Sequence, residues 1–316
     1  MLSYTLRRIL SAAVVVLLLL AAVSVLVHIL PGDPVRLMLG PKAPPALSAR
    51  AREEMGLDSS IPAQIWDFIV GAAHGDLGRD FVSREPVMSL IGKALPHTLL
   101  LAVGSLCVAI VGSLLLGVVS ANRPGGWLDR IVGTASVGIL SIPAYVVGLL
   151  LLLVFAVQLE WFPAIGTGDL TDPLDYLSHL VLPVLSLALV WVGYLARIVR
   201  SSMLEVLSTN YIRSARAYGI PRRRVLYQLA LRNAMMPVVA LLGIALGELI
   251  GSAIFIEVIF TRDGLGTLVY NAITDRNYPV IRGGVVTIAV LFVVANLLAD
   301  LANRALDPRT KEGAAS

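Results

Sequence analysis

Few side chains of this 316-residue chain have the type and surroundings that could do chemistry. The clearest candidate is Glu248, a carboxylate midway along a long apolar run, with Gly247, Gly251 and Ser252 close by. An ionisable group inside such a run is costly to bury and is therefore a candidate functional residue. Glu248 and Ser252 can line a path for a polar or positively charged solute, or Glu248 can be a protonated, hydrogen-bonded structural residue. The sequence favours neither interpretation.

The other polar feature is a basic stretch, Asn210–Pro237, which carries six arginines and no acidic residue. Apolar residues recur within it at helical spacing. Thr209 or Asn210 is placed to cap a first short helix, and Gly219 suits the left-handed position that ends it. Pro221 favours the first turn of a second helix. The stretch is therefore predicted to form two short helices. By physics alone, an amphipathic segment lying on anionic lipid is an equally good interpretation.

Motifs for covalent or hydrolytic catalysis are missing from the sequence. The chain lacks the Gly-x-x-x-x-Gly-Lys-Ser/Thr phosphate loop, so we do not expect it to hydrolyse ATP by itself. It has no His-Glu-x-x-His zinc motif, and its histidines are scattered at positions 28, 74, 97 and 179. The single cysteine, Cys107, excludes an internal disulfide and a cysteine metal cluster. We therefore predict that this chain has no catalytic residue, no metal site and no cofactor.

Composition places the chain in a membrane. Hydrophobic residues make up 57% and charged residues 15%, and the mean hydropathy is +0.83. A soluble domain carries about 25% charged residues. The isoelectric point near 9.4 reflects arginines that cluster at the edges of apolar runs, so membrane topology explains it better than a nucleic-acid partner does. The predicted class is an all-α polytopic membrane protein.

Six apolar runs are long enough to cross about 30 Å of hydrocarbon. A cleaved signal peptide is the rival interpretation of the first run, but its apolar core is too long for one. The third run is interrupted by Ser141-Ile-Pro143, and proline can kink or split a helix there. The predicted transmembrane helices are Ile9–Leu30, Thr98–Ala121, Ile131–Leu159, His179–Ala196, Ala234–Ile256 and Gly283–Ala299.

The positive-inside rule gives the orientation. With the N-terminus in the cytoplasm, the basic segments 122–130 and 197–233 and the basic tail all fall inside, whereas the acidic loop 159–178 falls outside. Both termini are therefore predicted to be cytoplasmic. The long segment 31–96 falls outside and is expected to be ordered, because structureless loops of this length are uncommon. We divide the chain into 1–96, the first helix plus this external segment, and 97–316, a core domain of five helices.

Two runs of the basic stretch, Ala215-Arg-Ala-Tyr-Gly219 and Leu231-Arg-Asn-Ala-Met-Met-Pro237, resemble the cytoplasmic "EAA" loop of ABC-importer permeases. Further runs of the chain are most similar to those of B-type subunits of the peptide/nickel (oligopeptide/dipeptide) subfamily. Together, the matching runs extend this resemblance over nearly the whole chain. The namesake Glu-Ala-Ala is replaced by Arg213-Ser214-Ala215 here. The further runs are Ala94-Leu-Pro-His-Thr-Leu99, Arg197-x-x-Arg-Ser-Ser-Met-Leu-Glu205, Asn277-Tyr-Pro279 and Ala305-Leu-Asp-Pro-Arg309.

The resemblance implies a function and an assembly. It implies a permease in the bacterial cytoplasmic membrane that forms half of a translocation pathway, as a heterodimer with a C-type permease. It also implies two cytoplasmic ATPase subunits that bind ATP and Mg²⁺, and an extracytoplasmic substrate-binding protein. The loop 209–237 would be the coupling helix pair between the fourth and fifth spans. The residues that would contact the ATPase are Arg213, Ser214, Ala215, Arg216, Ala217, Tyr218, Gly219 and Ile220.

Peptides are the expected substrates, with nickel chelates or glutathione as alternatives within the same family. A different class, an ion-coupled secondary transporter, normally needs intramembrane carboxylates or broken helices in paired repeats. Only Glu248 and the break at Pro143 offer such features, and the sequence shows no internal repeat. A membrane-embedded enzyme is disfavoured because no catalytic group of residues is found.

Overall fold

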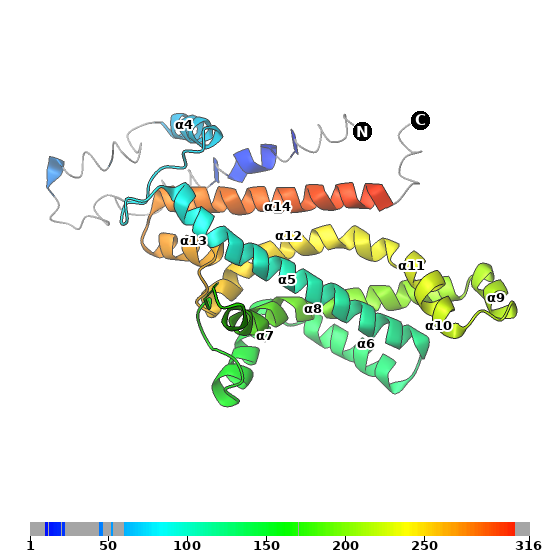
Figure 1. The fold of residues 1–316 in the computed structure, drawn as a ribbon. Coiled ribbons are helices and arrows are strands. Elements are labelled where there is room, and N and C mark those ends of the chain that lie inside the picture. Colours follow the sequence, from blue (N-terminus) through cyan, green and yellow to red (C-terminus); the bar gives the residue numbers. More distant parts are fainter. Residues whose placement is uncertain are drawn as a thin grey trace, which may run out of the picture. The chain divides into compact units, whose positions relative to one another are not determined.

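The structure, a computed structural model, describes residues 10–11, 13–19, 21–22, 44–46, 52, 60–169 and 171–306. Within these residues the chain is helical and contains no β-strand apart from an isolated bridge between Arg79 and Pro86 (Figure 1). The elements are α4 (Ile61–Ala73), α5 (Val87–Asn122), α6 (Trp127–Leu140), α7 (Ala144–Leu151), the π-helix η1 (Leu152–Gln158), α8 (Pro173–Leu207), α9 (Asn210–Ala217), α10 (Arg222–Arg224), the π-helix η2 (Val225–Ala230), α11 (Leu231–Ala234), α12 (Met236–Ile259), α13 (Leu265–Thr274) and α14 (Tyr278–Leu306).

Four helices are long and apolar enough to cross a membrane: α5, α8, α12 and α14. They overlap the second, fourth, fifth and sixth runs predicted from hydropathy, and each begins or ends beyond the predicted run. Residues 10–11, 13–19 and 21–22 of the first predicted run are helical. The rest of that run, most of the segment 31–59 and the tail from 307 lie outside the described residues.

The third predicted run is split into two helices. α6 ends at Leu140, α7 begins at Ala144, and the two helix axes differ by 107°. Pro143 has no N–H to continue the helical ladder, and its carbonyl instead accepts from the N–H of Val146 at 2.9 Å, which starts α7. The prediction of a break at Ser141-Ile-Pro143 is confirmed, and α6 with α7–η1 makes a fifth candidate span if the bent pair is counted as one.

One compact unit, Leu99–Arg262 with the chain from Val294, is organised around α8. This helix packs against α6, α7 and α12 and supplies a large share of the buried core. α5 approaches α8 closely at Gly117, where an added Cβ would lie 2.6 Å from the side chain of Val199 and 2.9 Å from the carbonyl oxygen of Ala196. Glycine is needed there because any side chain would push the two helices apart.

The other unit joins the chain up to Thr98 with Asp263–Val293. Its core includes Leu77, Val87 and Leu265. The N–H of Leu265 donates to the hydroxyl of Thr98 at 2.8 Å, which fixes the start of α13 against the first part of α5.

Asp80 organises the turn before α5 in this unit. Its carboxylate accepts hydrogen bonds from the N–H of Val82 (2.9 Å), from the N–H and hydroxyl of Ser83 (3.3 and 2.6 Å) and from the side-chain amide of Asn277. Burial raises the pKa of this carboxyl, but the hydrogen bonds to its charged form outweigh burial and hold the pKa below its usual value of 3.8. Its stabilising contribution is therefore present at neutral pH and is lost as the pH falls through the lowered value.

We expect Asp80→Ala to loosen the turn 79–86, because several donors lose a charged acceptor worth about 1.5–3 kcal/mol. Hydrogen exchange of a peptide covering the turn, measured by mass spectrometry at pH 7, should be at least about tenfold faster than in the wild type. Asp76→Ala is the matched control, because Asp76 is exposed and accepts one hydrogen bond, from Gly78 at 2.8 Å. Equal exchange rates in the two variants would contradict the assignment.

Candidate functional site

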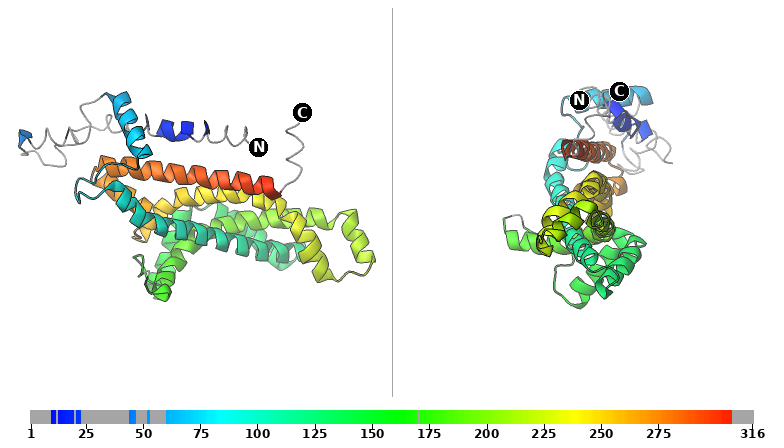
Figure 2. Two further views of the ribbon diagram at one scale, coloured as in Figure 1. Left: turned by 45° about the horizontal axis from the view of Figure 1, so that its top comes forward. Right: turned by 90° about the vertical axis from the view of Figure 1, so that its right-hand side faces the viewer.

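The basic stretch forms a compact helical turn at the C-terminal end of α8, within the unit built around that helix (Figure 2). α9 is closed by a Schellman motif. The N–H of Gly219 donates to the carbonyl of Arg216 at 3.0 Å, and the N–H of Ile220 donates to that of Ala215 at 3.1 Å. Gly219 has φ +77°, as its predicted left-handed position requires. Pro221 then directly precedes α10.

One expectation about this segment is wrong. Thr209 does occupy the N-cap position of α9, but its side chain does not bond to the N–H groups of the first turn. Its hydroxyl donates backwards to the carbonyl of Val206 at 2.6 Å, a carbonyl in the last turn of α8 that also accepts from the N–H of Thr209 at 3.1 Å. The cap residue therefore completes the preceding helix instead of the helix it begins.

The segment has one buried face and one exposed face. Ile212 of α9 is fully buried, and it lies in the same core as Val225, Leu226 and Ala230 of η2, the π-helix that follows α10. Asn233 of α11 donates to the hydroxyl of Tyr211 in α9 at 2.8 Å, and this hydrogen bond links the two helices. Of the residues predicted to contact an ATPase, Ala215 is buried and Ile220 half-buried. The exposed ones are Arg213, Ser214, Arg216, Ala217, Tyr218 and Gly219.

Hydrogen bonds connect this segment to the ends of the long helices. Arg222 donates through Nη2 to the backbone carbonyl of Asn122, the last residue of α5, at 2.7 Å. Three residues further on, the N–H of Gly125 donates to Oδ2 of Asp129 at 2.8 Å. Asp129 in turn binds Arg200 of α8. A path made of these hydrogen bonds and of the backbone between Asn122 and Gly125 therefore runs from α10 through the α5–α6 turn to α8.

Asp129 is the centre of that path. Its carboxylate is buried and is held by Nε and Nη2 of Arg200, the latter at 2.8 Å, and by the hydroxyl of Ser120. Sequence analysis missed this residue. An acidic group in the first turn of a helix is a general signal for stabilising that N-terminus. No sequence pattern indicates its pairing with Arg200, which lies 71 positions away.

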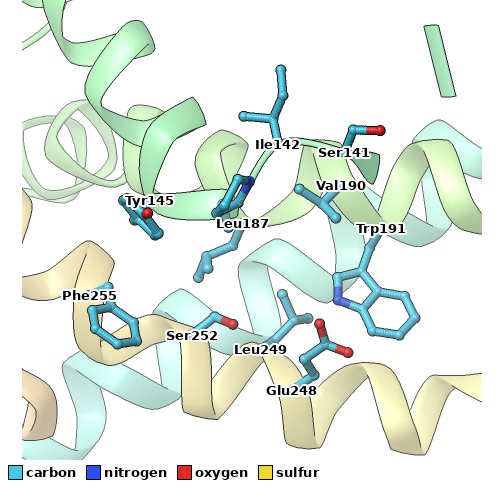
Figure 3. Close-up of a pocket in the computed structure, with 12 residues that line it drawn as sticks. Ser141, Ile142, Tyr145, Leu187, Val190, Trp191, Glu248, Leu249, Ser252 and Phe255 are labelled. Carbon is cyan, nitrogen blue, oxygen red and sulfur yellow. The ribbon is translucent and has the colours of Figure 1, made fainter. Parts of the chain in front are cut away.

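The second candidate site is a hollow of about 360 Å³ in the same unit. It is formed where the α6–α7 break faces α8 and α12. The break and Glu248, which the sequence analysis treated separately, therefore line the same hollow. Figure 3 shows the side chains of Glu248, Ser252 and Trp191 around this hollow. The lining residues are Ser141, Ile142, Pro143, Ala144, Tyr145, Leu187, Val190, Trp191, Glu248, Leu249, Ser252 and Phe255.

Glu248 is exposed and makes no hydrogen bond or ion pair with any residue in the described part of the chain. Among the described residues there is also no group of three or more His, Cys, Asp or Glu side chains that could hold a metal ion. Among the described residues that line the hollow, Glu248 is the only carboxylate.

Comparison with known proteins places the chain in a family. Residues 113–312 match the family described as "Binding-protein-dependent transport system inner membrane component", and residues 1–102 match its N-terminal region. The glutathione transport system permease protein GsiC of Pectobacterium atrosepticum is 37% identical over 308 residues, 98% of each chain. The GsiC protein of Escherichia coli (strain K12) is 36% identical over the same share.

The fold also has a solved neighbour. A chain of the MetNI methionine ABC transporter, solved in inward facing conformations, matches with a TM-score of 0.58 at 23% identity. The match covers 71% of the present chain and 99% of that chain, and at this identity it supports the fold alone. From the family match and the relatives that align along almost its full length, the chain belongs to the binding-protein-dependent transport system inner membrane components, as a multi-pass, non-catalytic permease subunit of an ABC importer.

Proposed function

We propose that this permease forms half of a translocation pathway for small peptides, glutathione among them, and that ATPase subunits drive it through the segment Arg213–Ile220. The substrate class is supported by relatives named as glutathione transport permeases, which are up to 37% identical over nearly the whole chain. In this proposal the chain has six spans with both termini in the cytoplasm. A second permease subunit, two ATPases that use ATP and Mg²⁺, and an extracytoplasmic binding protein complete the transporter.

The observation that carries the coupling role is the rigid, exposed basic turn between α9 and α10. Its φ-positive glycine, its Schellman hydrogen bonds and the Arg222–Asn122 bond give it one geometry. A partner that pushes on Arg213, Arg216 and Tyr218 therefore displaces the ends of α5, α6 and α8 together. A flexible loop would absorb the same push without moving the helices.

Purification from native membranes in mild detergent, followed by mass spectrometry, tests the assembly. We expect a second permease of similar size and two phosphate-loop ATPases to accompany the chain. Reconstituted import of radiolabelled glutathione and of trialanine should then stop when the phosphate-loop lysine of both ATPases is changed to alanine. Import that continues without ATP hydrolysis would favour an ion-coupled carrier, the class to which Glu248, which has no partner among the described residues, and the broken third span would also be suited.

A further inference from the structure

Glu248 is a charge for which the described chain supplies no partner. It lies midway along α12, a helix with high mean hydropathy, and its side chain is exposed at the hollow beside the α6–α7 break. A carboxylate facing lipid hydrocarbon is strongly unfavourable, so this side of α12 must face water, a solute or another polar surface. The position of the hollow therefore marks a part of the molecule that is not covered by lipid.

Three aromatic side chains share the hollow with this carboxylate. Tyr145 of α7, Trp191 of α8 and Phe255 of α12 all line the hollow with Glu248 (Figure 3). Trp191 is mostly buried and stacks edge-on against Tyr194 at 5.6 Å, which fixes its indole. The rings of Tyr145 and Phe255 contact each other with their centroids 6.2 Å apart. Trp191 is thus held by packing, whereas Tyr145 and Phe255 contact each other at the exposed side of the hollow.

This combination suits one kind of ligand group. Aromatic faces attract cations through their quadrupole, and a carboxylate supplies the opposite full charge. The hydroxyls of Ser141 and Ser252 are further acceptors for N–H donors. No lysine, arginine or histidine is among the described residues that line the hollow, so these residues offer no positive charge to pair with an anionic group. The lining side chains therefore favour a ligand group that carries a positive charge.

We propose that the hollow between α7, α8 and α12 is a subsite that binds the ammonium group of the substrate as it passes through the permease. The proposal rests on the proposed function, because it assigns a substrate group to the same pathway. It adds that this permease favours solutes with a free amino group, such as peptides and glutathione. N-blocked peptides, and metal chelates that lack an ammonium group, are disfavoured.

A chemical-labelling experiment tests charge selection without requiring transport. Ser252→Cys is introduced into the assembled transporter in a Cys107→Ser background, which removes the chain's own thiol. The rates of modification by a cationic (trimethylammonioethyl) and an anionic (sulfonatoethyl) methanethiosulfonate are compared. We expect the cationic reagent to be favoured about tenfold, because a carboxylate in a cleft concentrates cations. Glu248→Gln should remove this preference, and Glu248→Asp should keep most of it.

Protection of the cysteine at position 252 from labelling by added peptides identifies the ligand group. Trialanine should slow labelling at position 252, whereas N-acetyltrialanine at the same concentration should not, and Glu248→Gln should abolish the difference. The proposal is overturned if charge preference survives Glu248→Gln, if both peptides protect equally, or if neither reagent reaches the position. It is also overturned if Glu248→Gln dissociates the two permease subunits, because Glu248 is then a subunit contact. The proposed function is tested separately, because it fails if the wild-type transporter shows no ATP-dependent import.

Discussion

Replacement of Asp129 with alanine should lower the free energy of unfolding by about 2 kcal/mol, the usual effect of removing a charged acceptor from a partly buried ion pair. The loss has a structural cause. Arg200, Ser120 and Gly125 all donate to this carboxylate, and each donor would lose its acceptor. The α5–α6 turn would then be free to move relative to α8.

A double-mutant cycle separates the ion pair from general packing. We expect Asp129→Ala and Arg200→Ala each to lower the midpoint of thermal unfolding of the detergent-solubilised protein. Their combination should cost clearly less than the sum of the two single effects, because it leaves no charge unpaired. Arg197→Ala is the matched control, since Arg197 lies one helical turn earlier on α8 and is exposed. Strict additivity of the two changes would show that the residues do not act as a pair.

A substitution at the same residue should change coupling. Because the path from α10 to α8 runs through Asn122, Gly125 and Asp129, a variant that cuts it should still hydrolyse ATP. We expect fewer molecules of substrate to be imported per ATP in Asp129→Asn, which nearly preserves size and removes the charge. An unchanged ratio of import to hydrolysis would confine Asp129 to a role in stability.

The second large effect is expected at Gly219. An added Cβ would have open space, with no atom within 4 Å, so a substitution there is strained only by the φ of +77°. Non-glycine residues pay about 1–3 kcal/mol in this region, and β-branched residues are the least suited to it. Gly219→Val should therefore reduce ATP-driven import about tenfold or more while membrane insertion is unaffected, because each 1.4 kcal/mol corresponds to a factor of ten.

Two further substitutions sharpen this experiment. Gly219→Pro should be worse than Gly219→Val, because proline cannot adopt a positive φ and lacks the N–H that donates to Arg216. Gly219→Asn is the matched control and should retain most of the import, because asparagine tolerates the left-handed region. Import at wild-type levels in both the valine and proline variants would refute the view that the α9–α10 turn acts as a rigid lever.

Much of the local structure follows from the sequence. Apolar runs long enough to span a bilayer predict α5, α8, α12 and α14, because hydropathy is a property of contiguous residues. The break before Ala144 follows from the missing N–H of Pro143. The left-handed turn follows from Gly219, which carries no Cβ to oppose it. These effects depend on a residue itself or on its neighbours in the sequence. They can be predicted without knowing what packs against the segment.

Pairings between distant segments are decided by the tertiary structure alone. The binding of Asp129 to Arg200, across 71 positions, depends on how α6 is packed against α8. The hollow depends on the bend at Ser141-Ile-Pro143, which brings Tyr145 of α7 to the same cavity as Glu248 and Trp191. Even the hydroxyl of Thr209 bonds to the carbonyl of Val206, at the end of the preceding helix, instead of the expected N–H. By itself the sequence determines which segments are helical and where they break. Which polar groups meet is set by helix packing, because their energies depend on distances that no local pattern encodes.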